Sequence, residues 1–167
     1  MLARGGGTAP AVSSHMQTSL RLVPFIILLA TTGCHNEQRT ELDSATERWQ
    51  QAGPGTSYEF TFRRSCNCSG DVTAPIRVTV TNGAITDAVY TADGSQATEA
   101  ARMNVRTIGE LFALIDDAID SADDMRVTYD LTDGHPTAID IDWESATADE
   151  ETSIRVTDLA PTSAAAL

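Results

Sequence analysis

The sequence predicts an α+β fold, with helices packed on one face of an antiparallel sheet, and three observations support this. First, a capping-box pair, Thr107 and Glu110, begins an amphipathic helix. Second, two segments of alternating apolar and polar residues follow that helix, joined by turn residues at 133–136. Third, the N-terminal half holds further alternating segments around the turn pair Asn82-Gly83. Helices layered on one side of a sheet would bury all of these apolar faces together.

The first 33 residues have the layout of a signal peptide. Residues 1–15 are of low complexity, so we expect the targeting segment to start at Met16. It continues with a basic start, MQTSLR, an apolar run too short to span a bilayer, LVPFIILLA, and a small-residue site, TTGC. We therefore expect residues 1–33 to act as a signal peptide.

The cysteine that ends this segment resembles the lipobox cysteine of bacterial lipoproteins. The resemblance implies cleavage after Gly33 and lipidation of Cys34, and hence a membrane anchor in a bacterial cell envelope, facing the periplasm or the exterior. Thr31 stands where the lipobox usually has leucine, which leaves an ordinary secretory signal as the alternative. The polar residues 34–40 are expected to form a tether to the folded domain.

A single α+β domain is expected over residues 41–160, and its first half contains a helix and then strands. Leu42, Ala45 and Trp49 have helical spacing, and Gly53-Pro54-Gly55 ends this helix. Apolar residues then alternate with polar ones at Tyr58, Phe60 and Phe62, at Ile76, Val78 and Val80, and in the segment 85–90. Residues 91–106 are polar and predict a long connection.

The second half has the same outline. Its helix has one apolar face, formed by Ile108, Leu111, Phe112, Ile115, Ile119 and Ala122. Its strands alternate at Met125, Val127 and Tyr129 and, after the turn Asp133-Gly134-His135-Pro136, at Ile139, Ile141 and Trp143. The halves are either an internal repeat or independent hairpins of similar composition. Residues 161–167 are expected to be a disordered tail.

Charge narrows the classes of partner. Formal net charge is −13, and because Arg4 and Arg21 are the only charged residues before Cys34, the nine basic and 24 acidic residues from there on give −15. Such a chain repels phosphate backbones, so we expect no nucleic-acid partner. A charged partner should be basic, or a cation.

The two remaining cysteines, Cys66 and Cys68, are the sharpest chemical feature of the sequence. In an exported chain they meet oxidising conditions, and a bend would bring an i,i+2 pair within reach of a disulfide. A disulfide that kinks the end of the strand is the favoured interpretation. A redox-active pair, metal thiolate ligands and free thiols stay open as alternatives.

An acidic stretch follows the last predicted strand. Counted from Asp140, carboxylates fall at positions 1, 3, 5 and 12 of an EF-hand-like loop, at Asp140, Asp142, Glu144 and Glu151. Ser145 replaces the glycine of the sharp turn, and a strand precedes the loop instead of a helix. We therefore expect a solvated acidic strand face and loop, without calcium or another metal.

The sequence contains no recognisable catalytic motif. His15, His35 and His135 form no recognisable triad motif with a serine, and no glycine-rich phosphate loop is present. Arg63 and Arg64 form either an anion site or a charge balance for nearby acids. We expect no enzyme activity, no catalytic residues and no cofactor.

Taken together, the motifs of residues 45–159 resemble a family of uncharacterised bacterial lipoproteins, a domain of unknown function with a C-x-C motif. The resemblance rests on Trp49, Tyr58-x-Phe60, Arg64, Cys66-x-Cys68, Arg77-Val78-x-Val80, Gly83, Thr107-Ile108-x-Glu110-Leu111-Phe112, Val127-x-Tyr129-Asp130, Gly134-x-Pro136, Ile139-x-Ile141-Asp142 and Asp149-Glu150. It implies a secreted, membrane-tethered domain with no assigned activity. We expect a non-enzymatic binding or inhibitory module with a protein or peptide partner; the alternative is a thiol–disulfide or metal-handling protein that uses Cys66 and Cys68.

Overall fold

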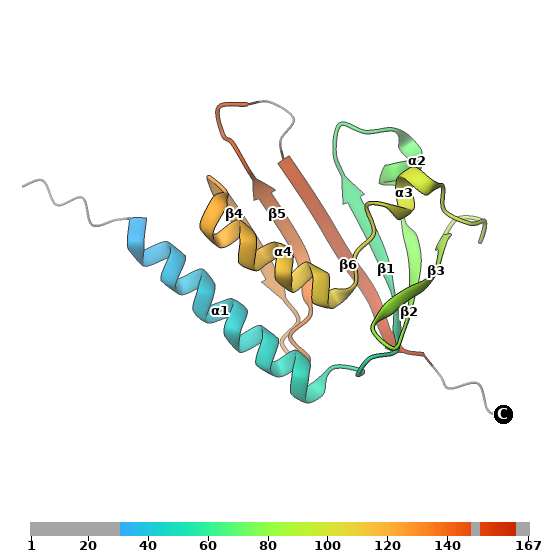
Figure 1. Ribbon diagram of the computed structural model, residues 1–167, viewed down its shortest axis with the longest axis horizontal. Coiled ribbons are helices and arrows are strands. Elements are labelled where there is room, and N and C mark those ends of the chain that lie inside the picture. The colour runs from blue at the N-terminus through green and yellow to red at the C-terminus, as the bar shows by residue number, and fades with distance from the viewer. Residues whose placement is uncertain (1–30, 148–150, 163–167) are drawn as a thin grey trace, which may run out of the picture.

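The computed structural model describes residues 31–147 and 151–162 and confirms the α+β fold (Figure 1). Six strands form one antiparallel sheet in the order β3-β2-β1-β6-β5-β4. The predicted signal segment up to residue 30 and the predicted tail from residue 163 lie outside the described residues. None of the helices in the described part of the chain is long and apolar enough to cross a membrane.

Apart from the short helices α2 and α3, the elements follow one another along the chain as a helix with three strands and then a second helix with three strands. Their bounds are α1 Thr31–Ala52, β1 Tyr58–Ser65, α2 Gly70–Thr73, β2 Ile76–Thr81, β3 Ala84–Tyr90, α3 Glu99–Arg102, α4 Ile108–Ser121, β4 Asp124–Tyr129, β5 Pro136–Asp142 and β6 Glu151–Pro161. Corresponding strands of the two halves run in opposite directions, because three antiparallel steps separate them. To superpose one half on the other, its strands would have to reverse direction and keep their order in the sheet. The rotation that does this also moves the helices of that half to the opposite face of the sheet. The halves therefore do not superpose as a simple repeat.

The predicted strands form for the predicted reasons. Along β1 the side chains alternate, with Tyr58, Phe60 and Phe62 buried and the residues between them at least partly exposed. The hairpin β2–β3 turns at Asn82 and Gly83, whose φ angles of 52° and 80° are those of a type I′ turn.

Helix α4 begins at the predicted capping box. The Thr107 hydroxyl accepts the Glu110 N–H at 3.1 Å, and the Glu110 carboxylate accepts the Thr107 N–H at 2.7 Å. A third helix-start donor, the Ile108 N–H, is bonded at 3.1 Å to the buried Tyr58 hydroxyl. The apolar face of α4 is buried as predicted, and α4 lies beside α1 on one face of the sheet (Figure 1).

The residues expected to form the tether, 34–40, are helical and belong to α1. Two of them are bonded to the domain. The Gln38 side chain donates to the Met125 carbonyl at 3.0 Å, and Arg39 forms ion pairs with Asp116 and with Asp120, the second at 2.9 Å. The apolar pattern of α1 starts only at Leu42. The part of the helix before Leu42 is bonded to the domain by polar side chains, so an apolar pattern could not indicate it.

Strand β6 was not predicted, although it lies at the centre of the sheet between β1 and β5. Ile154 and Val156 point into the core, with 2% of each residue exposed. Its last residue, Pro161, pairs with Tyr58, and the Thr162 N–H is bonded to the Ser57 carbonyl at 3.3 Å. The first two residues of the expected tail, 161 and 162, thus pair with or bond to the start of β1 and its preceding residue.

The second face of the sheet carries no helix among the described residues. We call it the open face. Its residues are exposed or half-buried and include Glu59, Thr61, Arg63, Arg77, Thr79, Asp87, Val89, Asp124, Arg126, Thr128, Ala138, Asp140, Asp142, Ser153, Arg155 and Thr157.

Candidate functional site

The turn between β4 and β5 brings together three side chains of types that can bind a metal: Asp130, Asp133 and His135. One carboxylate oxygen of Asp130 accepts the backbone N–H groups of Thr132, at 2.7 Å, and of Asp133, at 3.2 Å. The Gly134 N–H is bonded to the Asp130 carbonyl at 3.0 Å. These bonds close a tight turn in which aspartate is favoured because its side chain caps its own backbone.

His135 is held by the second aspartate. The Oδ1 atom of Asp133 accepts the His135 backbone N–H at 3.0 Å and lies 2.5 Å from Nδ1 of the ring. An ionised carboxylate is acceptor-only, so Nδ1 carries the hydrogen of this bond. In the neutral ring, the lone pair is then on Nε2.

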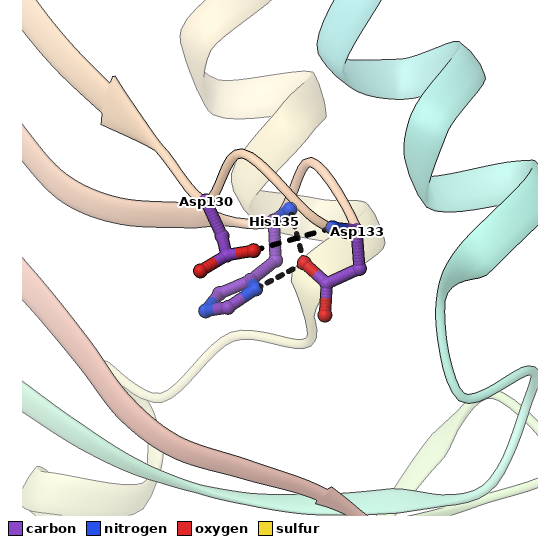
Figure 2. Close-up of side chains that lie close together, drawn as sticks. All are labelled: Asp130, Asp133 and His135. Atoms are coloured by element: carbon purple, nitrogen blue, oxygen red, sulfur yellow. Dashed lines mark hydrogen bonds and ion pairs between the residues drawn. The ribbon is translucent and has the colours of Figure 1, made fainter.

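The three side chains offer one ligand atom each within 4.8 Å of one another. Figure 2 shows the two carboxylates on either side of the ring, Asp133 at Nδ1 and Asp130 toward the opposite ring nitrogen. A carboxylate oxygen and an imidazole nitrogen are both ligands of divalent transition metals.

Helix α1 covers this turn. A Cβ built on Gly134 would lie 2.2 Å from the Ala45 carbonyl oxygen, so only glycine permits this approach. The Trp49 ring lies 6.5 Å, centroid to centroid, from the His135 ring. His135 is consequently a buried polar residue, with 7% of its surface exposed.

A cavity of about 590 Å³ opens beside the turn. It is lined by Asp130, Asp133, His135, Thr137, Arg155, Val156, Thr157, Asp158 and Leu159. Asp158 lies where the pairing of β1 with β6 shifts by one residue, and its φ of 56° is left-handed. Bulges of this kind redirect side chains and are frequent next to functional sites. Here the bulge adds a carboxylate to the cavity wall.

Backbone donors also affect the electrostatics of the turn. The pKa of Asp130 is lowered from its ordinary value, mainly by the hydrogen bond from the Thr132 N–H. Burial opposes this with the next largest effect, and the Asp133 N–H and His135 lower the pKa further. Asp130 is thus an anion throughout the neutral range.

The predicted cysteine pair lies at the other end of the sheet, in a bend directly after β1. The two sulfur atoms are at bonding distance and the Cα atoms are 5.2 Å apart, within the range for a disulfide. Cys68 is exposed and Cys66 half-buried. The pair lines a cavity of about 480 Å³ together with Arg64, Asn67, Trp143, Glu151 and Thr152.

The two adjacent arginines do not form one site. Arg63 extends from the open face, and Arg64 lies on the helix-covered side, where its guanidinium donates to the Asn104 side chain. The Nε atom of Arg64 is buried and has no hydrogen-bond partner in the described part of the chain. An anion site built from both arginines together is therefore excluded.

The acidic stretch is divided between two strands. Asp140 and Asp142 belong to β5, Glu151 opposite Asp142 belongs to β6, and Asp149 and Glu150 lie outside the described residues. Arg155 binds Asp140 with two hydrogen bonds of 2.9 and 3.0 Å and holds the pKa of that carboxyl below its usual value. Strand pairing thus replaces the single twelve-residue loop that an EF-hand requires.

The cluster of Asp130, Asp133 and His135 was not singled out from the sequence. The signal was present as Asp130-x-x-Asp133-x-His135, but each residue there has an ordinary role in a turn. No sequence pattern indicated Asp158, because its position in the cavity wall depends on how β6 pairs with β1.

In a comparison with known families, residues 41–161 match the sequence model of the family described as "Family of unknown function (DUF6174)". No curated protein and no solved structure matches the chain. The matched range contains every described strand.

Proposed function

The chain belongs to the family of unknown function DUF6174, and from that premise we propose that it is a lipid-anchored protein of the bacterial cell envelope whose domain binds a protein or peptide partner without catalysis. The partner site is the open face of the sheet. The observation that carries this proposal is that the helices cover one face only, among the residues described, and leave the other exposed across the sheet.

The anchor part of the proposal is supported by the sequence around Cys34 and by the position of α1. Among the side chains that the structure describes, the first that bond α1 to the domain are Gln38 and Arg39. Four helical residues rise about 6 Å. A lipidated Cys34 would therefore hold the domain close to the membrane surface, with the membrane-facing end near the start of β4.

The binding part is supported by the chemistry of the open face. Four of the nine arginines from Cys34 onward extend from it: Arg63, Arg77, Arg126 and Arg155. Arg63 and Arg155 lie directly opposite each other on neighbouring strands, an arrangement that destabilises an isolated sheet. Arg155 is paired with Asp140, whereas Arg63 and Arg77 make no ion pair with any described residue. Although the net charge of the chain favours a basic partner overall, these two guanidinium groups are thus available locally to carboxylates of a partner.

Site-specific photocrosslinking in cells tests the binding part. A photoreactive amino acid at Thr61, which lies on β1 beside Arg77, should give one discrete crosslinked product. The matched control is Ala113, exposed on α4 on the helix-covered side. The Thr61 product should disappear when Arg63→Glu and Arg77→Glu are combined. Equal products from both positions, or a product that survives both charge reversals, would refute binding through the open face.

The anchor is tested separately, with an alkyne-labelled fatty acid and membrane fractionation. The wild-type chain should take up the label and stay with membranes. The Cys34→Ser variant should lose the label and move to the soluble fraction, still folded. A labelled or membrane-bound Cys34→Ser variant would refute lipidation at this residue.

The alternative function, thiol–disulfide or metal-thiolate chemistry at Cys66 and Cys68, is favoured by one observation. Cys68 is exposed beside a cavity, so a reductant or a second thiol can reach its sulfur. Trapping by Cys66→Ser and Cys68→Ser distinguishes the two functions: a redox protein gives mixed disulfides with other proteins through the remaining cysteine, and a static disulfide gives none.

A further inference from the structure

We propose that His135 and Asp130 bind a divalent transition-metal ion, for which Zn²⁺ is the probe, and that Asp133 holds the imidazole in the ligating orientation. This inference goes beyond the proposed function and does not depend on it. The open face and the lipid anchor could each be refuted and leave this site unaffected.

The first argument is the imidazole. Asp133 fixes the hydrogen on Nδ1, which leaves the Nε2 lone pair directed away from Asp133. Metal-ligating histidines commonly donate their other ring N–H to a carboxylate in this way. The His135 side chain is 9% exposed, and its Nε2 atom makes no hydrogen bond within the part of the chain that the structure describes. A nine-tenths buried ring is thus oriented with one nitrogen unused.

The second argument is the position of Asp130. Its Oδ1 atom is fixed by two backbone N–H groups, which leaves Oδ2 for another partner. Figure 2 shows the Asp130 carboxylate on the side of the ring nitrogen that Asp133 does not contact. One candidate ligand atom from each of the three residues lies within 4.8 Å of the others, so the turn already brings the Asp130 carboxylate and the imidazole close together.

A turn alone does not require this arrangement. Asp93 makes the same kind of turn, with its Oδ1 atom accepting the Ser95 N–H at 2.9 Å and the Ser95 hydroxyl at 2.7 Å. A serine at position 95 is thus enough to complete the hydrogen bonds of that turn. At the β4–β5 turn the corresponding residue is a buried histidine below α1, and that ring adds a nitrogen ligand that the turn does not use.

The donor set indicates the class of ion. One imidazole with carboxylate oxygen suits Zn²⁺ and its neighbours, whereas Ca²⁺ and Mg²⁺ prefer oxygen alone. The adjacent cavity of about 590 Å³ has room for water ligands, and Asp158 adds a negative charge to its wall. The site therefore resembles an open site with exchangeable positions more than a closed structural zinc site.

NMR of the ring nitrogens in the untagged full chain tests the proposal directly. The chain has three histidines, so His15→Gln and His35→Gln leave His135 as the single imidazole. Thiols are blocked with iodoacetamide to exclude zinc thiolates. Addition of Zn²⁺ should shift the His135 Nε2 resonance and leave Nδ1 protonated. An unchanged Nε2 resonance at saturating Zn²⁺ would overturn the proposal.

Three variants then identify the oxygen ligand through Zn²⁺ affinity, measured by calorimetry. Asp130→Asn keeps an oxygen to accept the turn N–H groups but loses the anionic ligand, and should weaken binding at least 10-fold. Asp133→Asn keeps the bond to the ring but not its charge, and should cost about 10–100-fold. Asp93→Asn, the matched control in the other turn, should change affinity less than 2-fold. Affinity that survives Asp130→Asn, or falls equally in Asp93→Asn, would refute this ligand assignment.

Discussion

Gly134 lies so close to Ala45 that α1 can rest on the β4–β5 turn only because position 134 has no side chain. A Cβ there would lie 2.2 Å from the Ala45 carbonyl oxygen and 2.9 Å from Cβ of Arg48, and the φ of Gly134 is 81°. Both constraints act on the residue between Asp133 and His135. The contact therefore links the helix that follows Cys34 to the turn that holds the buried imidazole.

The variant Gly134→Ala should lower the free energy of unfolding by more than the backbone strain of an alanine in the left-handed conformation. The strain of that conformation is about 1–2 kcal/mol, and the overlap with the Ala45 carbonyl adds to it because backbone atoms must move. Gly94→Ala is the matched control, since Gly94 has a φ of 74° and open space around it. Urea unfolding of both variants gives the difference. Equal losses would mean that α1 does not press on the turn.

The buried face of α4 gives a second prediction. Phe112 is 8% exposed and stacks on Tyr129 with ring centroids 6.4 Å apart. Phe112→Ala should therefore lower the free energy of unfolding by about 3–5 kcal/mol. Leu131→Ala, at a leucine that is 89% exposed, should change it by less than about 0.5 kcal/mol. A loss below about 1 kcal/mol at Phe112 would show that this face is not part of the core.

The elements that could be predicted from sequence are those with a local signal. The capping box of Thr107, the turn at Asn82-Gly83 and the alternation in β1 each specify their structure through neighbouring residues. Strand β6 also has a local signal, because Ile154 and Val156 fit the alternation of a strand. The acids around 149–151 nevertheless favoured the interpretation of this region as a loop.

Features that depend on long-range pairing could not be read in this way. The start of α1 depends on Arg39 reaching Asp116 and Asp120, 77 and 81 residues away. The position of Asp158 in the cavity depends on a register shift between β1 and β6. For the same reason the cluster at Asp130 appeared as turn chemistry alone, because the burial of His135 is caused by a helix some 90 residues earlier in the chain.

The pH dependence of stability should depend in part on Asp140. Its hydrogen bonds from Arg155 lower its folded-state pKa below the ordinary value of 3.8. A carboxyl with a depressed folded pKa stabilises above its unfolded pKa and loses that contribution as pH falls through the folded pKa. Asp140→Asn should thus destabilise at pH 7, by less than about 1 kcal/mol because the pair is half-exposed, and have no such effect near pH 2.

Urea midpoints at the two pH values check this, with Asp117→Asn as the control. Asp117 is exposed on α4 and its carboxylate makes no ion pair with a described residue. Its substitution should have nearly the same effect at both pH values. If Asp140→Asn behaved in the same way, the pair with Arg155 would not contribute to stability.

The cysteine pair allows the sharpest prediction about stability. Its loop contains only three residues, 66–68, and loop-closure entropy then gives about 1.6 kcal/mol of stabilisation, the low end for a disulfide. The combined variant Cys66→Ser, Cys68→Ser should therefore fold and lose less than about 2 kcal/mol. Wild-type protein should lose the same amount when reduced, and the double variant should not respond to the reductant.

The size of that loss also bears on function. A disulfide that adds little stability to the folded state is reduced at less negative potentials than one that adds much, because the folding energy and the redox free energy are coupled. A loss near 1.6 kcal/mol is therefore compatible with a bond that exchanges beside the exposed Cys68. A loss above about 4 kcal/mol would mean that the bond holds the packing around Arg64 and Trp143, and would exclude a freely exchanging pair.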